Sequence, residues 1–260
     1  MAEIKGDLAQ ILCGIPIMIP GCNIAVSQPK VKDICAFGED SFFLALNMFL
    51  KADKMAEEIK QGNSQLSYLS DFQILMVVFE QEPEAKSSIT DLFNLIFPNY
   101  IYEFDAGCIN FRIEESERII GRLDPMNFEN FQGILKTLFF PQGGVDEDED
   151  PEYKPANDKA AEIAAKLKRG NEIRRQMKEK ENGKNAPSSL FATYTSALAV
   201  GLGIDINILF GYTPFQLFDA FIRYNKKSAY DLYQKVSTTP MMDVSKMDAP
   251  DIWFGDIYNQ

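Results

Sequence analysis

The chain has 260 residues, of which 46% are hydrophobic and 12% aromatic, so it holds enough apolar mass for one large domain or two small ones. Its formal net charge of −12 disfavours nucleic-acid binding, because binding to the phosphate backbone needs a clustered basic face. The chain contains no histidine, which excludes Ser-His-Asp and Cys-His catalysis and the HExxH zinc site.

The N-terminal segment is apolar but interrupted by turn-forming residues. Its run ILCGIPIMIPGCNIAV contains two glycines and two prolines, and no positively charged region precedes it, so neither a signal peptide nor a membrane-spanning helix is expected. Residues 15–28 are predicted to form two short extended segments around the Pro20-Gly21 turn. The cysteines, Cys13, Cys22, Cys35 and Cys108, follow no zinc or disulfide spacing, which predicts buried thiols in a reducing cytoplasm.

Helical periodicity dominates the next segments. Apolar side chains recur every three to four residues over 30–62, which predicts a helix with one buried face that Gly38 divides in two. Three further helices are predicted at 70–82, at 87–98 and from 127 onward. Ser70 or Asp71 is expected to cap the first of these helices, and Pro98 is expected to end the second. The last of them carries a stripe of Phe128, Phe131, Ile134, Leu135 and Leu138.

Between these helices, residues 100–114 change from helical to alternating periodicity. Tyr100, Tyr102 and Phe104 alternate with polar residues, and a second alternating run follows the short sequence DAG. This pattern predicts a β-hairpin. The extended segment at 15–28 is expected to pair with it in one small antiparallel sheet.

Residues 143–157 differ in composition from both flanking regions. They include five consecutive carboxylates, Asp146 to Asp150, together with glycines and prolines, which predicts a flexible linker. Calcium binding by these acids is disfavoured, because an EF-hand loop counted from Asp146 would have Pro151 and Asn157 where glycine and glutamate are required. Residues 158–185 carry nine basic and five acidic side chains and read as a charged, solvated helix rather than a nucleic-acid contact.

The segment after the linker is predicted to form three helices. The first runs from 190 to about 202, a short one follows, and Thr213-Pro214 starts the third, which continues to about residue 235. The chain is therefore predicted to be α+β and predominantly helical. Its predicted parts are an N-terminal domain with the small sheet (1–142), the linker (143–157), the charged helix (158–185) and a helical C-terminal domain (186–260).

No residue pattern predicts catalysis. The adjacent acids Glu39 and Asp40 are more typical of a solvated helix face than of a catalytic pair, and the glycines near residues 201–207 match no phosphate-binding motif. We therefore expect a protein that is not an enzyme and that has no catalytic residues, no cofactor and no metal site.

Aromatic residues of the C-terminal helices are the candidates for partner binding. Their spacing fits a buried core, and the alternative is that part of the stripe stays exposed as a groove for a partner protein. The candidates are Phe191, Tyr194, Phe215, Phe218, Phe221 and Tyr224.

Two stretches resemble one family of bacteriophage proteins. They are SSLFATYTSALAVGLGIDINILFGYTPFQLFDAFIRY, with the AYDLYQKV that follows it, and the N-terminal SQPKVKDICAFGEDSFFLALNMF. They resemble tail assembly chaperones, or closely associated tail proteins, encoded in the tail-morphogenesis region of long-tailed phages of Gram-positive bacteria, and they cover roughly half of the chain.

The resemblance implies a viral, non-enzymatic protein that keeps the apolar, helical tape measure protein soluble until tail tube subunits assemble around it. It implies action in the host bacterial cytoplasm during assembly, with no nucleic acid or membrane as partner and with self-association as an option. Two alternatives remain open at this point: an accessory structural protein retained in the virion, and a regulator or decoy that binds a host protein.

Overall fold

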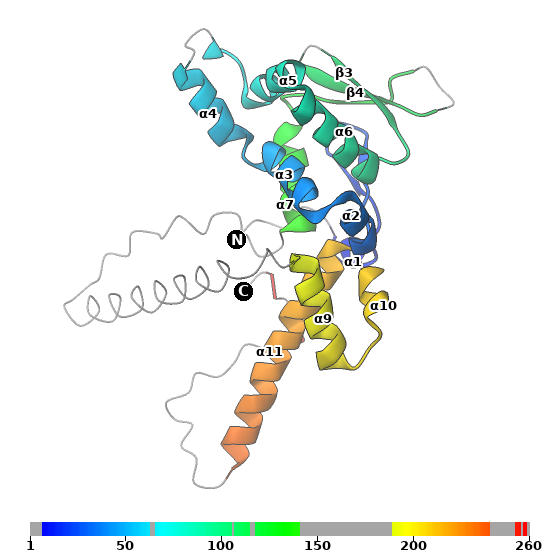
Figure 1. Cartoon of the computed structure of the whole chain (residues 1–260), viewed down its shortest axis with the longest axis vertical. Coiled ribbons are helices and arrows are strands. Elements are labelled where there is room, and N and C mark those ends of the chain that lie inside the picture. Colours follow the sequence, from blue (N-terminus) through cyan, green and yellow to red (C-terminus); the bar gives the residue numbers. More distant parts are fainter. Residues whose placement is uncertain are drawn as a thin grey trace, which may run out of the picture. The chain divides into compact units, whose positions relative to one another are not determined.

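The fold is an α+β arrangement that is predominantly helical, as predicted. The computed structural model describes residues 7–62, 66–105, 107–114, 118–140, 189–239, 253–255 and 257–258. Figure 1 shows its helices, which are α1 (Leu8–Leu12), α2 (Val31–Phe37), α3 (Glu39–Leu50), α4 (Ala52–Gly62), α5 (Asp71–Gln81), α6 (Pro83–Ile96), α7 (Phe128–Phe139), α9 (Leu190–Leu202), α10 (Ile206–Phe210) and α11 (Pro214–Thr238). The strands are β1 (Ile17–Met18), β2 (Ala25–Val26), β3 (Ile101–Asp105), β4 (Cys108–Arg112) and β5 (Gly121–Leu123).

The strands form two separate antiparallel sheets instead of the single sheet that was expected. Strands β1 and β2 pair only with each other, while β3, β4 and β5 form a three-stranded sheet in that order. The two sheets nevertheless approach each other at Gly121, where an added Cβ atom would overlap the carbonyl oxygen of Cys22 and the side chain of Ile24. Residues 22–24 therefore lie against β5 without pairing with the sheet.

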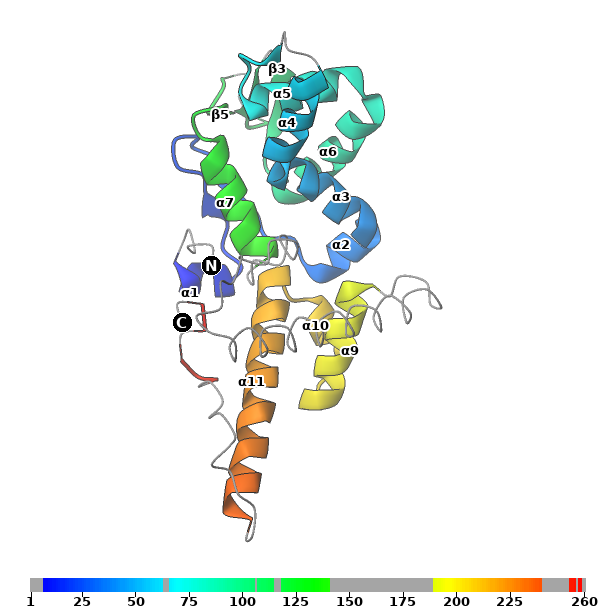
Figure 2. The ribbon, with the colours of Figure 1, turned by 90° about the vertical axis from the view of Figure 1, so that its left-hand side faces the viewer.

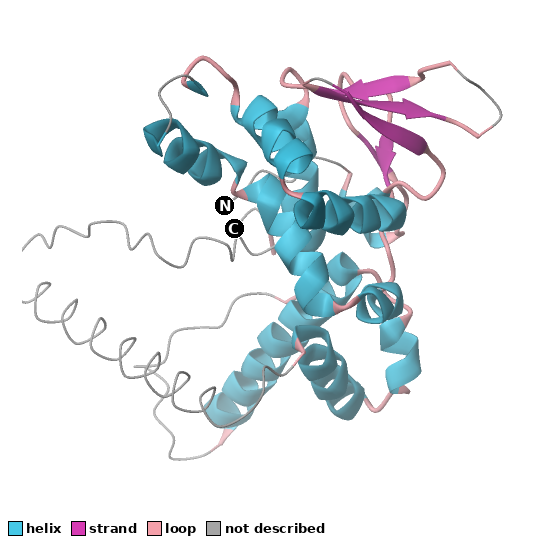
Figure 3. Ribbon diagram, turned by 45° about the horizontal axis from the view of Figure 1, so that its top comes forward, coloured by secondary structure: helices cyan, strands magenta, loops and turns pink. Residues whose placement is uncertain are grey.

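A dense cluster of phenylalanines forms the core of the N-terminal region. The ring of Phe93 in α6 stacks on Phe49 of α3 at 5.5 Å and lies 6.4 Å from Phe131 of α7. Phe97 meets Phe111 of β4 edge to face at 4.9 Å, which joins the helices to the sheet. Figure 3 shows the strands of this sheet beside the helices that cover it.

The ends of the N-terminal helices follow local sequence signals. Ser70 caps α5, since its hydroxyl accepts a hydrogen bond from the Gln73 amide, as predicted. Gly38 separates α2 from α3 with a φ of 108°, a conformation that side-chain-bearing residues rarely adopt. Helix α6 begins earlier than predicted, because Pro83 occupies its first turn, where proline is favoured.

Residues Met1–Gly143 and Tyr194–Gln260 make up one compact unit, and Gly144–Thr193 make up a second. Within the first unit, α11 contacts α1 and α7, and α10 contacts α2. Two hydrogen bonds link these segments: the Val31 amide donates to the Tyr212 carbonyl at 2.8 Å, and Gln216 Nε2 donates to the Leu12 carbonyl at 2.6 Å. Figure 2 shows α9 and α10 beside α11.

The predicted linker at 143–157 and the predicted charged helix at 158–185 lie outside the described residues. The division into an N-terminal and a C-terminal domain therefore stays a prediction. Within the described ranges, no helix has the length and apolar character needed to cross a membrane.

Candidate functional site

The C-terminal helices begin at capping residues that the sequence largely predicts. The Ser189 hydroxyl accepts a hydrogen bond from the Ala192 amide at the start of α9, and the Asp205 carboxylate accepts one from Asn207 at the start of α10. Thr213 and Gln216 form a capping box at the start of α11, and Pro214 occupies its first position. These caps fix where each helix starts, and hence which side chains lie between α9 and α11.

The aromatic residues proposed from the sequence as partner contacts are mostly enclosed. Phe191 and Phe215 are completely buried. The ring of Tyr194 in α9 stacks on Phe221 of α11 at 4.3 Å and meets Phe218 edge to face at 5.5 Å.

The last of the six candidates, Tyr224, lies against the backbone of α9. A Cβ atom at Gly201 would overlap its ring, so the glycine is what allows this close approach. With Tyr194, Phe218 and Phe221 half-buried as well, the aromatic stripe holds α9 on α11 instead of forming an open groove.

A second set of apolar side chains, which sequence reasoning missed, is exposed where α9 ends and α10 begins. Val200 is 83% exposed, Ile208 55%, Leu202 48% and Ile206 38%. These four residues are named the α9–α10 surface below. One signal in the sequence could have identified it: Asp205 is the only charged residue between Ser189 and Phe218, although much of α9 faces solvent.

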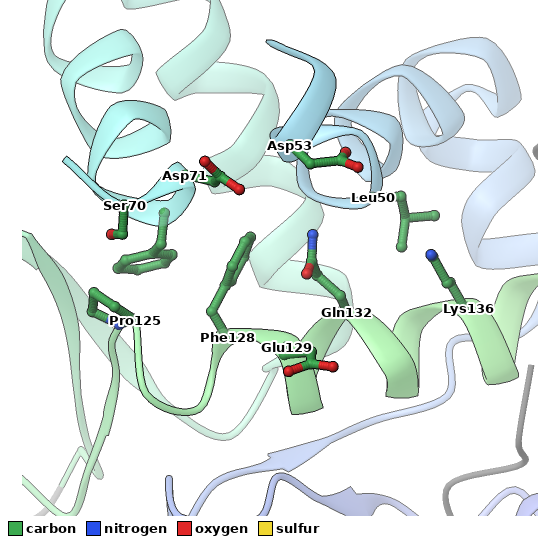
Figure 4. A pocket seen from close by; sticks show the side chains of 10 residues that line it. Leu50, Asp53, Ser70, Asp71, Pro125, Phe128, Glu129, Gln132 and Lys136 are labelled. Atoms are coloured by element: carbon green, nitrogen blue, oxygen red, sulfur yellow. The ribbon is translucent and has the colours of Figure 1, made fainter. Parts of the chain in front are cut away.

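The structure also contains a pocket of about 330 Å³ in the N-terminal region. Figure 4 shows Phe128, Gln132 and Lys136 of α7 pointing toward the ends of α4 and α5. The pocket is lined by Leu50, Asp53, Ser70, Asp71, Phe72, Pro125, Phe128, Glu129, Gln132 and Lys136. Its wall includes the rings of Phe72 and Phe128, whose centroids are 4.9 Å apart.

Several polar groups of the pocket already form bonds within the protein. Asp71 pairs with Lys60 at 2.9 Å, and Ser70 is used in the capping box of α5. The Gln132 amide donates to the Phe49 carbonyl at 2.7 Å. We therefore assign no ligand to this pocket.

The cysteines differ in exposure, and three of them have perturbed pKa values. Cys22 and Cys108 are buried, whereas Cys13 and Cys35 are exposed, which corrects the expectation that all four would be buried; all four are free thiols. Burial raises the pKa of Cys22 to about 12 and also raises that of Cys108. Cys35 is exposed as a residue, but partial desolvation of its thiol and the charge of Glu39 raise its pKa as well. Because the thiolate is the nucleophilic form, these three thiols are poorly suited to covalent catalysis near neutral pH.

The outer face of the three-stranded sheet carries a polar network. The Arg122 guanidinium donates to the side-chain oxygen of Asn110 at 3.1 Å, and the Asn110 amide donates to Asp105 at 3.4 Å. Arg112 pairs with Glu103 on the neighbouring strands. This network gives hydrogen-bond partners to the side-chain oxygen and nitrogen of Asn110, which is only 7% exposed. The fold therefore explains why these polar side chains lie together.

Among the described residues, the α9–α10 surface is one of several places where apolar side chains are exposed; others include Met126, Leu44 and Leu232. When the chain was compared with known proteins, no protein-family model, no curated protein and no solved structure matched it.

Proposed function

We propose that this chain is a non-enzymatic, chaperone-like phage tail assembly protein that binds apolar helical segments of a tail protein such as the tape measure protein. The observation that carries the proposal is the α9–α10 surface. The family resemblance of the two stretches quoted above narrows the class of partner to tail proteins.

The α9–α10 surface has the character of a protein-binding patch. Its four aliphatic residues fall within nine positions of the chain and are between 38% and 83% exposed. Scattered single apolar residues are normal on a protein surface, but grouped ones mark interaction sites. A partner helix that covers Val200 or Ile208 would remove an exposed apolar side chain from water, and burial of apolar surface is the main favourable term in association.

Charge around the surface favours an apolar partner over a charged one. Helix α9 has no charged residue in its first or last turn, and its sequence LFATYTSALAVGL contains none at all. The nearby Asp205 carboxylate already accepts hydrogen bonds from the main chain and side chain of Asn207 at the start of α10. A charged partner segment would therefore lose its hydration beside the uncharged α9, where no side chain could form an ion pair with it.

Side-chain size along α9 favours a helical partner. Ser196, Ala197 and Val200 are exposed, and the first two lie one turn before Val200 on the helix. Side chains this small allow a second helix to approach closely, because the distance between packed helices depends on the residues at the contact. The net charge of −12 on the rest of the chain keeps a complex with an apolar client soluble.

The test is co-expression of the full chain with fragments of a tape measure protein from a long-tailed phage of Gram-positive bacteria. We expect the chain to be soluble alone and to co-purify with an apolar helical fragment, with a dissociation constant in the micromolar range or below. Absence of any complex at micromolar concentration would contradict the proposal.

Mass spectrometry of purified virions separates the chaperone from the alternatives. A chaperone is released before the virion is complete, so we expect none of its peptides in the particles. Stoichiometric amounts in the virion would instead identify an accessory structural protein, and capture of a host nuclease or polymerase would identify a regulator or decoy.

A further inference from the structure

The C-terminal segment of the chain lies on the N-terminal half of α11. Tyr258 is only 7% exposed, and its ring stacks on Phe215 with centroids 5.4 Å apart. Its hydroxyl donates a hydrogen bond to Oδ1 of Asp219 at 2.7 Å. One aromatic side chain of the tail therefore makes both an apolar and a polar contact with α11.

The main chain of the same segment is held by Arg223. The Nη1 group of Arg223 donates to the carbonyl of Trp253 at 2.9 Å and to that of Gly255 at 3.3 Å. The Arg223 Nε group donates to the Asp219 carboxylate at 3.2 and 3.0 Å, which orients the guanidinium toward the tail. The side chain of Asp219 is only 10% exposed, so this ion pair is largely shielded from water.

These contacts define what kind of segment fits on α11. A ring must cover Phe215, a hydroxyl must reach the buried Asp219 carboxylate, and backbone carbonyls must accept from Arg223. If the tail leaves, the partially buried charges lose hydrogen-bond partners and the Phe215 ring is uncovered. A replacement that lacks a hydroxyl leaves the carboxylate without that donor, which is unfavourable for a buried group.

The length of the chain lets the tail dock on its own helix. Residues 240–252 join the end of α11 to Trp253, and when fully extended they would reach about 45 Å. The distance back along α11 from Thr238 to Arg223 is about 22 Å at the rise of an α-helix. The joining residues are therefore long enough for the tail to reach its site. Because the tail is tethered, its effective concentration at the site is on the order of millimolar.

We propose that Phe215, Asp219 and Arg223 form a peptide-binding site, that the chain's own C-terminal segment occupies it in a turn conformation, and that a tyrosine-bearing segment of the client protein displaces this tail. The competition with a client rests on the proposed function, whereas the docking of the tail does not. Displacement of the tail uncovers the Phe215 ring. Because the tail and the client segment compete for the same site, the client segment must bind this site more strongly than the docked tail does.

Trp253 provides a direct probe, because it is the only tryptophan in the chain and lies in the docked segment. The experiment measures its fluorescence anisotropy and acrylamide quenching in the full-length protein. The competitor is a synthetic peptide of residues 251–260 that carries Trp253→Phe, so that it does not fluoresce. We expect the peptide to lower the anisotropy and raise the quenching of Trp253 in a saturable way.

A conservative variant tests the hydroxyl contact. Tyr258→Phe keeps the ring on Phe215 but removes the donor to Asp219, so we expect the ratio of free to docked tail to rise about tenfold or more. Tyr230→Phe on the same helix is the matched control and should leave Trp253 unchanged, because the Tyr230 hydroxyl bonds only to exposed Gln234 among the described contacts. If neither the peptide nor Tyr258→Phe alters Trp253, the site does not exist.

Client binding tests the second half of the inference separately. Because its tail is released more easily, Tyr258→Phe should bind the tape measure fragment about three- to tenfold more tightly than the natural chain. An unchanged affinity would refute competition between tail and client while leaving the peptide site intact. A dimer that forms with rising concentration and is dissolved by the peptide would show that the tail of a second copy is the occupant, which would also refute the client assignment.

Discussion

The N-terminal region and the C-terminal helices use aromatic residues in different ways. In the N-terminal region, Phe93 is completely buried and has aromatic neighbours on several elements, including Phe49, Phe97 and Phe131. In the C-terminal helices, Tyr194 and Phe221 are only half-buried and connect α9 to α11. Beyond that contact, the apolar side chains of the α9–α10 surface face solvent.

The comparison shows that the number of apolar residues in a segment does not tell whether their side chains form the core or face solvent. Helices α3, α5, α6 and α7 and the sheet enclose one another, so their phenylalanines stabilise the fold. The exposed aliphatic residues Val200 and Ile208 contribute little to a core, because burial is what makes an apolar side chain stabilising. We therefore expect substitutions in the first region to change stability and substitutions in the second to change binding.

The largest effect on stability is expected from Phe93→Ala. Removal of this ring leaves a cavity among Phe49, Phe97 and Phe131, and should lower the free energy of unfolding by about 3–5 kcal/mol. Urea denaturation measures the change. Tyr68→Ala is the matched control, because Tyr68 is 80% exposed and its loss should alter stability by no more than about 0.5 kcal/mol. Equal losses for the two variants would refute the phenylalanine core.

Two glycines allow the regions to be compared by the same substitution. Gly121→Ala forces a Cβ atom onto the backbone carbonyl of Cys22, whereas Gly201→Ala forces one onto the outer end of the Tyr224 ring, which can move. We expect Gly121→Ala to lower the free energy of unfolding by about 3 kcal/mol and Gly201→Ala by about 1 kcal/mol.

Thermal or urea denaturation of both proteins measures the difference. Gly62→Ala is the control, since no atom lies within 4 Å of a Cβ added there. A larger loss at Gly201 than at Gly121 would show that the contact between α9 and α11 is the more rigid of the two.

Local signals in the sequence explain how much of the fold could be predicted. Thr213-Pro214 marks the start of α11, Ser70 marks the start of α5, and the alternating runs around DAG mark β3 and β4. Each of these signals acts within a few residues. The start of α6 is not predicted by periodicity, because the residues after Pro83 are mostly polar and lack the apolar spacing of the later turns.

Features that depend on distant residues could not be predicted from local patterns. Strand β5 has only three residues, and its place in the sheet is fixed by pairing with β4 and by the close approach of Cys22. The contact between Tyr258 and Asp219 joins positions 39 residues apart and leaves no periodic signal. The exposed α9–α10 surface was missed for another reason: helical spacing directs attention to aromatic residues, and these residues are enclosed between helices.

A smaller effect on stability is expected at alkaline pH. The pKa of Cys22 is raised from 9.0 to about 12 by burial, and that of Tyr102 from 10.0 to about 12 by burial and by the charge of Asp91. Above pH 9 the unfolded chain therefore loses these protons before the folded chain does, so stability should fall between pH 9 and pH 12.

Urea denaturation at pH 8, 9.5 and 10.5 measures this loss. The decline should be shallower in Cys22→Ala, because that variant has no thiol to ionise at this position. An identical decline in both proteins would show that Cys22 does not contribute.

The smallest change in stability is expected on the α9–α10 surface. Val200→Lys and Ile208→Lys place a cation near the last turn of their helices, where positive charge is tolerated, and both side chains are at least half exposed. We expect the free energy of unfolding of the double variant to stay within about 0.5 kcal/mol of the natural protein. A loss above about 2 kcal/mol in urea denaturation would mean that this surface belongs to the core.

The most direct test of a binding role for this surface is the affinity of the same double variant for the tape measure fragment, measured by isothermal titration calorimetry. Met126→Lys is the control, because Met126 is 93% exposed but lies in the N-terminal region. We predict that Val200→Lys with Ile208→Lys weakens binding by at least about tenfold, while Met126→Lys leaves it unchanged. Undiminished affinity in the double variant would contradict this prediction.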